Sequence, residues 1–253
     1  MKKVLVLLLA LTLIVSLCAC GANKVVDVNP TASSDGAAAI RADFEKAKAF
    51  VEANIDMKNM EAQDQDQEDP SYLYQYWFAQ DAPNAEFSLD AELDGQTVTV
   101  GKTTVKELKE LGFELSTDQK VIEPDVSTGL SLSKGDKICN ITLANNDTGK
   151  ELPIDEGVLS EVDMIGNEFG ISYAYSGLKD QSSFKNVIDK LGAPNSQVKI
   201  SSDDSGVSIE LSYFNSTQDG DKTSDKSLTV YFGYDTTNNA ASVRQINLAI
   251  TQS

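Results

Sequence analysis

The segment TTVKELKELG at residues 103–112 decides the fold, because it recurs with one inserted residue as SSFKNVIDKLG at residues 182–192. Each copy begins with hydroxyl residues that can cap a helix, carries apolar residues at helical spacing, and ends at a glycine. In the first copy, Thr104 and Glu107 match the capping-box pattern. The recurrence suggests two related units, each with one short helix.

Strands in which apolar and polar residues alternate are predicted around both helices. Before the first helix, residues 87–93 alternate, and Asp94-Gly95 is a two-residue hairpin turn that leads into a returning strand. The remaining strands are predicted at 129–132, 137–144, 158–165, 207–213, 228–234 and 246–250. The polar segments 215–226 and 235–241 are predicted to be turn-rich linkers.

The region before these strands has a different composition. Residues 22–36 are polar and lack apolar periodicity, which is typical of a flexible tether. Residues 37–60 carry apolar side chains at three- and four-residue steps, including Ile40, Phe44 and Val51, and this spacing predicts an amphipathic helix.

The sequence therefore predicts an α+β fold, in which an N-terminal helix is followed by two small antiparallel-sheet units that each carry a short helix. We expect five parts along the chain. These are a signal peptide at 1–19, a tether at 20–36, a helical segment with an aromatic cluster at 37–84, and α+β units at 85–165 and 166–253.

The N-terminus resembles a bacterial lipoprotein signal. Two lysines precede an apolar run at residues 4–15, which is shorter than the roughly 20 residues that a membrane-spanning helix needs. The run leads to LCACG at residues 17–21, which is similar to a lipobox with Ala19 just before Cys20. We therefore expect lipid on Cys20 and a position on the outer face of the bacterial cytoplasmic membrane. The alternative is an ordinary secretory signal with an incidental cysteine.

The charge and the missing histidine exclude several functions. The net charge is −18, with 39 acidic and 21 basic residues, and a charge of this sign repels nucleic-acid phosphates. The chain has no histidine, which removes Ser-His-Asp and Cys-His catalysis and the commonest zinc ligand. If Cys18 leaves with the signal and Cys20 is acylated, Cys139 remains alone, and its alternating surroundings predict a buried side chain in a sheet.

Six aromatic residues are candidates for ligand contact. They are Tyr74, Tyr76 and Trp77 in the aromatic segment 72–78, and Tyr213, Tyr231 and Tyr234 in the last strands. Aromatic rings can stack on sugars, but they also fill cores, so the segment 72–78 either packs beneath the first helix or contacts a ligand. The three tyrosines of the last strands are candidates if they lie on the exposed face of a sheet.

We predict no cofactor, metal site or catalytic residue. The acidic segment 219–225 begins like a calcium-binding loop, but Ser224 and Val230 occupy the positions that require glycine and glutamate. The acids at 64–69 fail in the same way. No phosphate-binding or dinucleotide-binding motif is present in the sequence.

The segment 182–194, which ends in Leu191-Gly192-Ala193-Pro194 and precedes a strand meander, resembles the helix-plus-sheet units of the beta-lactamase-inhibitor-protein-like and SmpA/OmlA-like families. Residues 101–114 and 139–162 also resemble a module of Gram-positive surface lipoproteins. These families act through protein contact or assembly, so the resemblance implies binding and carries over no active site.

We therefore expect a non-enzymatic, lipid-anchored extracellular protein that binds a protein or another envelope component. One alternative is a cell-wall glycan enzyme that uses Asp and Glu, with two acids facing each other across a cleft beside Trp77. Another is an inhibitor of a secreted hydrolase that presents its aromatic residues on the exposed face of a sheet.

Overall fold

A computed structural model describes residues 34–56, 60–64, 72–78, 84–145, 149–203 and 205–252. By its internal contacts the chain divides into Met1–Ala39 and Ile40–Ser253. In the first part, only the opening turns of an N-terminal helix lie among the described residues. The predicted signal peptide, Cys20 and most of the tether lie outside the described residues.

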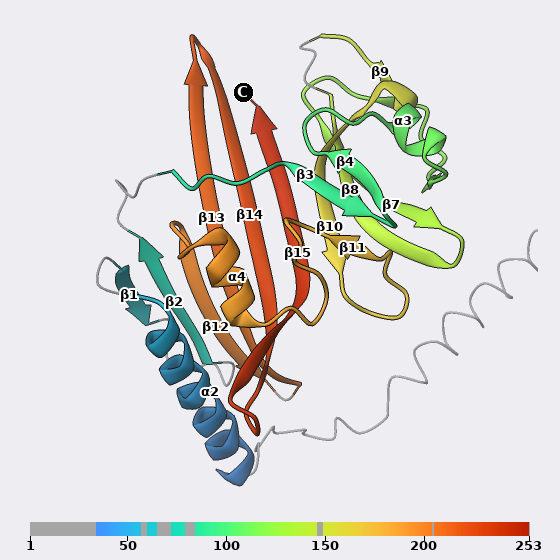
Figure 1. Ribbon diagram of the computed structural model, residues 1–253. Helices are drawn as coiled ribbons and strands as arrows, with labels where there is room; N and C mark the ends of the chain where they lie inside the picture. The colour runs from blue at the N-terminus through green and yellow to red at the C-terminus, as the bar shows by residue number, and fades with distance from the viewer. Residues whose placement is uncertain are drawn as a thin grey trace, which may run out of the picture. The chain divides into compact units, whose positions relative to one another are not determined.

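The second part combines short helices with many antiparallel strands (Figure 1), as the predicted α+β class requires. The helices are α2 (Ser34–Asn54), α3 (Val105–Glu110), α4 (Phe184–Leu191) and the short 3-10 helix η1 (Ile154–Glu156). The strands up to the second repeated helix are β1 (Met60–Asp64), β2 (Tyr72–Phe78), β3 (Asp90–Leu93), β4 (Gln96–Thr99), β5 (Glu114–Ser116), β6 (Val121–Ile122), β7 (Ser127–Lys134), β8 (Lys137–Ala144), β9 (Leu152–Pro153), β10 (Val158–Ile165) and β11 (Tyr173–Ala174). The remaining strands are β12 (Gln197–Asp203), β13 (Gly206–Asp219), β14 (Lys222–Asp235) and β15 (Ala240–Gln252).

One ten-stranded antiparallel sheet contains strands from the whole second part. Its order is β1-β2-β12-β13-β14-β15-β10-β8-β7-β5. β10 pairs with β15, so strands from both predicted units join in one sheet across the boundary predicted at residue 165. Two smaller sheets, β11-β3-β4 and β6-β9, complete the described strands.

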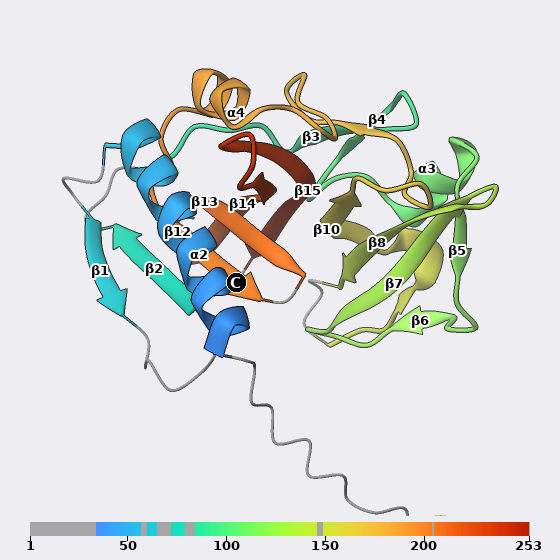
Figure 2. The same cartoon turned by 90° about the horizontal axis from the view of Figure 1, so that it is seen from below.

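Each face of the large sheet has a different character. Over residues 207–215 of β13 and 228–234 of β14 the side chains alternate between buried and accessible, so Leu211 and Val230 face the core while Ser212 and Thr229 do not. α2 and α4 cover the apolar face, because Phe50 of α2 and Phe184 of α4 pack on each other and on Tyr234 and Phe232. Figure 1 is viewed from this covered side, and Figure 2 shows the same layers from below.

Both repeated helices begin and end as the sequence predicted. The Thr104 side chain accepts a hydrogen bond from the Glu107 backbone N–H, and the Glu107 carboxylate accepts one from the Thr104 backbone, so the capping box is complete. Ser183 caps α4 by accepting from the Asn186 N–H. The glycine after each helix, Gly112 or Gly192, has a positive φ that other residues rarely adopt.

Other local predictions have mixed outcomes. The Asp94-Gly95 hairpin is confirmed, and so is the burial of Cys139, which is 3% exposed. The prediction of a turn-rich linker at 215–226 is wrong. β13 and β14 continue as paired strands to Asp219 and Lys222 and are joined by a two-residue turn, because polar residues pair across the hairpin as regularly as apolar ones.

Candidate functional site

The uncovered face of the large sheet carries a row of polar side chains with one residue on each of eight neighbouring strands. The strand registers place these residues directly opposite one another. The polar row consists of Ser116, Ser131, Asn140, Asp163, Asn247, Thr229, Ser212 and Gln197. Every side chain in it is at least partly exposed, so the row presents hydrogen-bonding groups to solvent across the sheet.

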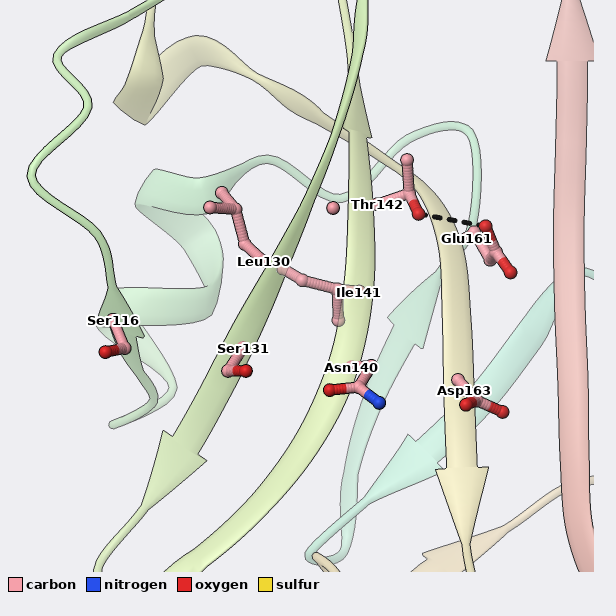
Figure 3. A pocket seen from close by; sticks show the side chains of 9 residues that line it. Ser116, Leu130, Ser131, Asn140, Ile141, Thr142, Glu161 and Asp163 are labelled. Carbon is pink, nitrogen blue, oxygen red and sulfur yellow. Dashed lines mark hydrogen bonds between the residues drawn. The ribbon is translucent and has the colours of Figure 1, made fainter. Parts of the chain in front are cut away.

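A cavity of about 440 Å³ lies over one half of this row, on β5, β7, β8 and β10. Figure 3 shows Ser131, Asn140 and Asp163 lying side by side across three of these strands. Thr142 and Glu161 form the next row, where the Thr142 hydroxyl donates to the Glu161 carboxylate over 2.9 Å. This row begins at Gly129, which has no side chain and therefore leaves the surface hollow at that point.

Two carboxylates on β10 are held by two amides on β15. The Asn247 side-chain amide donates to Glu161 over 2.6 Å, and the Gln245 amide donates to Asp163 over 2.5 Å. These two diagonal bonds join the last strands of the two predicted units along the polar face. Because amides donate without adding a positive charge, both carboxylates are oriented but their charges are not neutralised.

The surroundings raise two pKa values at this site. Burial raises the pKa of Asp163, and the neighbouring Glu161 carboxylate adds to the rise, while hydrogen bonds from Gln245 and other amides oppose it. Burial also raises the pKa of Tyr231 to about 12, together with the carboxylates of Glu210, Asp163 and Glu161. The Tyr231 phenol therefore keeps its proton at neutral pH and can donate a hydrogen bond.

Of the three tyrosines predicted in the last strands, only Tyr231 lies on this polar face. Tyr213 and Tyr234 do not meet the condition set for candidates, since they are 1% and 7% exposed and belong to the core. The Tyr213 hydroxyl donates to the Gly192 carbonyl after α4, and the Tyr234 hydroxyl donates to the Asn239 side chain. Alternation explains the difference. Tyr231 is three residues from Tyr234 on β14, and also three residues from Leu228, the residue that pairs with Tyr213, so its side chain points to the opposite face from both tyrosines.

The aromatic segment forms the backbone of β2, between β1 and β12. The side chains of Tyr74, Tyr76 and Trp77 lie outside the described residues, so their predicted ligand contact stays a prediction. In the backbone register, Trp77 is opposite Gln197, the last residue of the polar row. Cys20 also lies outside the described residues.

Glu161 and Asp163 are not arranged as the glycan-enzyme alternative requires. Glu161 and Asp163 project from one strand, side by side, rather than facing each other across a cleft. Four strands separate β10 from β2, which carries Trp77, so the acids are about 24 Å from that strand at the usual strand spacing. Among the described residues, no group of three acidic or cysteine side chains is placed to hold a metal ion.

No direct signal for the polar row is present in the sequence. Alternation along each strand indicates which residues are accessible, and Asn140, Asp163 and Asn247 fit that pattern. Their alignment depends on the pairing of β8 with β10 and on the pairing of β10 with β15. The second of these joins Asp163 to Asn247, which is far away in the sequence. A comparison of the last strands of the two predicted units, position by position, shows an acid in the first where the second has an amide, and this match could have indicated the diagonal bonds.

Comparisons with models of protein families, with curated proteins and with solved structures find no match to this chain. Within the described ranges, no helix has the length and apolar character needed to cross a membrane.

Proposed function

We propose that this chain is a lipid-anchored extracellular binding protein, built from two tandem helix-plus-meander repeats, that holds its ligand on the polar face of the shared sheet. The observation that carries the proposal is the 440 Å³ cavity over Asn140, Glu161 and Asp163, where oriented polar groups line a hollow on an accessible sheet. The lipid anchor rests on the lipobox at residues 17–21.

The order of elements supports the two repeats. α3 is followed by β5, β7, β8 and β10, and α4 is followed by β12, β13, β14 and β15, with each set adjacent in the sheet. The capping residues pair with the last strands at equivalent places, Thr104 with Val158 and Ser183 with Ser242. Such agreement is expected from a duplicated unit, and it matches the tandem units that the sequence resemblance implies.

The irregularities of the last strands agree as well. A register shift in β10 skips Ser160, and a register shift in β15 skips Arg244. Both lie two residues after the position that pairs with the helix cap, Val158 or Ser242. Since β-bulges are specific features of a fold, their equal placement favours a common origin of the two units.

Binding rather than catalysis is supported by the state of the carboxylates. Both oxygens of Glu161 already accept hydrogen bonds, from Thr142 and Asn247, and Asp163 accepts from Gln245. Groups fixed in this way are preorganised to hold a ligand. A glycoside hydrolase would instead need a second carboxyl group on the other side of the glycosidic bond.

The anchor is tested by replacing Cys20 with alanine in the full-length protein. We expect the variant to be released into the medium, because the lipid would be its attachment to the membrane. A variant that still fractionates with membranes would contradict the anchor.

The binding face is tested by filling the cavity. A Cβ at Gly129 would meet no heavy atom within 4 Å, so Gly129→Tyr should fold normally and occupy the hollow. We expect detergent-solubilised Gly129→Tyr protein to lose its binding to isolated cell envelopes. Thr97→Tyr, on the exposed side of β4 and outside the cavity lining, is the matched control and should bind as the unaltered protein does. Equal envelope binding by both variants would refute this site.

A further inference from the structure

We propose that the ligand of the polar face is a glycan strand without acidic groups, lying along the polar row with its sugars over the Gly129 hollow. This inference rests on the proposed function, since it names the ligand class of the same face. The argument comes from the spacing of the row, the charge of its surroundings and the chemistry of the lining.

The spacing of the polar row suits an extended polymer of rings. Neighbouring strands are about 4.8 Å apart, so the eight positions from Ser116 to Gln197 span about 34 Å. One sugar ring of an extended glycan has a similar length, so successive sugars would each meet one polar side chain. A peptide strand lying across the sheet would have no such match, because its backbone groups pair along strand edges rather than across a face.

The lining chemistry matches hydroxyl groups. Hydroxyls both donate and accept hydrogen bonds, and the cavity offers acceptor carboxylates at Glu161 and Asp163, an amide at Asn140 and hydroxyls at Ser131 and Thr142. Tyr231 adds a phenol that keeps its proton and the edge of a half-buried ring beside the same carboxylates. Among the described residues that line the cavity, the apolar ones are Leu130 and Ile141, and Ile141 is buried, whereas a protein partner normally needs aromatic or aliphatic anchors. The exposed Ile138 lies outside the lining, two residues along β8 from Asn140.

The charge excludes acidic polymers. Among the described residues, no lysine or arginine lines the cavity. Elsewhere on this face, Lys199 lies 4.0 Å from Glu210, and the Arg244 side chain lies against Gly233 of β14. The chain as a whole carries a net charge of −18. Polymers that carry phosphate or carboxylate groups would therefore be repelled, whereas a neutral glycan would experience no such electrostatic repulsion.

The test is a calorimetric titration of the full-length protein in detergent with two neutral probes, a pentamer of N-acetylglucosamine and a pentamer of β-linked glucose. We expect at least one to bind with a Kd of about 1 mM or tighter. Gly129→Tyr should weaken this binding at least about tenfold, while Thr97→Tyr should leave it unchanged. Asn140→Ala, at an exposed position, gives a second measurement if the tyrosine disturbs folding.

The outcomes separate the ligand class from the site. If neither pentamer binds at about 10 mM, and protease treatment of the envelopes removes binding that Gly129→Tyr also removes, the ligand is a protein. The glycan is then refuted while the proposed function stands. If a pentamer binds equally well to Gly129→Tyr, Asn140→Ala and the unaltered protein, the glycan site is elsewhere and this inference fails. Binding of poly-glutamate at the same cavity would also overturn it.

Discussion

The sheet strands that follow α3 and those that follow α4, the two halves of the large sheet, occur in the same order, but the 440 Å³ cavity over the polar row lies on the first half. Counting outward from the paired residues Asp163 and Asn247, each position of one half has an equivalent in the other. Gly129 and Thr142 of the first half are equivalent to Glu210 and Tyr231 of the second. In the second half, the Glu210 carboxylate and the Tyr231 ring occupy the space that is open above Gly129 and Thr142 in the first half.

The same comparison explains the diagonal hydrogen bonds between β10 and β15. Glu161 and Asp163 are equivalent to Gln245 and Asn247, so the first half has an acid where the second has the matching amide. Asn247 lies opposite Asp163 but donates to Glu161, and Gln245 lies opposite Ile165 but donates to Asp163. The two amides of β15 therefore complement the two acids of β10. The two halves thus differ, because the first contains the hollow and the acids, and the second contains the amides that donate to those acids.

The largest effect is expected in the core beneath the second half. Tyr213 is equivalent to the buried Leu132, but its hydroxyl also donates to Gly192 over 3.0 Å. Tyr213→Leu should lower the free energy of unfolding by about 3 kcal/mol, from the lost ring and the unpaired carbonyl. Urea unfolding measures this, and Tyr213→Phe, which keeps the ring, should cost only about 1 kcal/mol. An equal decrease in the free energy of unfolding for the two variants would mean that the packing of the Tyr213 ring contributes no stability beyond that of a leucine, the residue at the equivalent position of the first half.

The next effect concerns the cavity itself. Gly129→Glu combined with Thr142→Tyr gives the first half the residues of the second and should weaken binding of the neutral pentamers at least about tenfold, or about 1.4 kcal/mol. The opposite pair, Glu210→Gly with Tyr231→Thr, should open a second hollow and leave the first intact. Calorimetry on both double variants decides the matter. Unchanged affinity in the first of them would show that the hollow is not the reason for the difference.

A smaller effect is expected at the helix caps. Thr104→Ala should cost about 1 kcal/mol, and Ser183→Ala somewhat less, because the Thr104 hydroxyl also donates to the Glu107 carboxylate, a bond for which Ser183 has no equivalent among those that cap α4. The backbone hydrogen bond from Thr104 lowers the pKa of Glu107, so this contribution is present above the ordinary carboxyl pKa and is lost as the pH falls through the lowered value. Denaturation at several pH values should therefore show the two alanine variants converging in acid. A constant difference would contradict the capping-box explanation.

Local features of both halves could be predicted because short-range chemistry determines them. The caps at Thr104 and Ser183, the turn at Asp94-Gly95 and the burial of Cys139 each depend on a few neighbouring residues. The long β13–β14 hairpin was missed beyond residue 215, because polarity alone does not distinguish a turn from a solvent-exposed strand pair.

The candidate site could not be predicted for a different reason. Its row depends on sheet register, and register is fixed by pairings between distant segments such as β10 and β15. A shift of one residue in that pairing would remove Asn247 from the face that carries Asp163. The three tyrosines of the last strands are candidates by residue type, whereas the position of each residue in the alternation decides that Tyr231 is partly exposed and that Tyr213 faces the core.

The smallest effect is expected from exchanging the central acid for its equivalent amide. Because the folded-state pKa of Asp163 is raised, its protonated form is favoured by folding, and stability falls as the pH rises through the raised value. Asp163→Asn should remove this fall, so that the variant is the more stable protein at neutral pH and the difference closes below a pH of about 4. The reciprocal Asn247→Asp places a second carboxylate opposite the first, and it should be less stable at neutral pH but recover in acid. Chemical denaturation between acid and neutral pH measures both variants. Parallel pH profiles for all three proteins would show that the acid and the amide at this junction are interchangeable, and the proposed division between the halves would then rest on Gly129 and Thr142 alone.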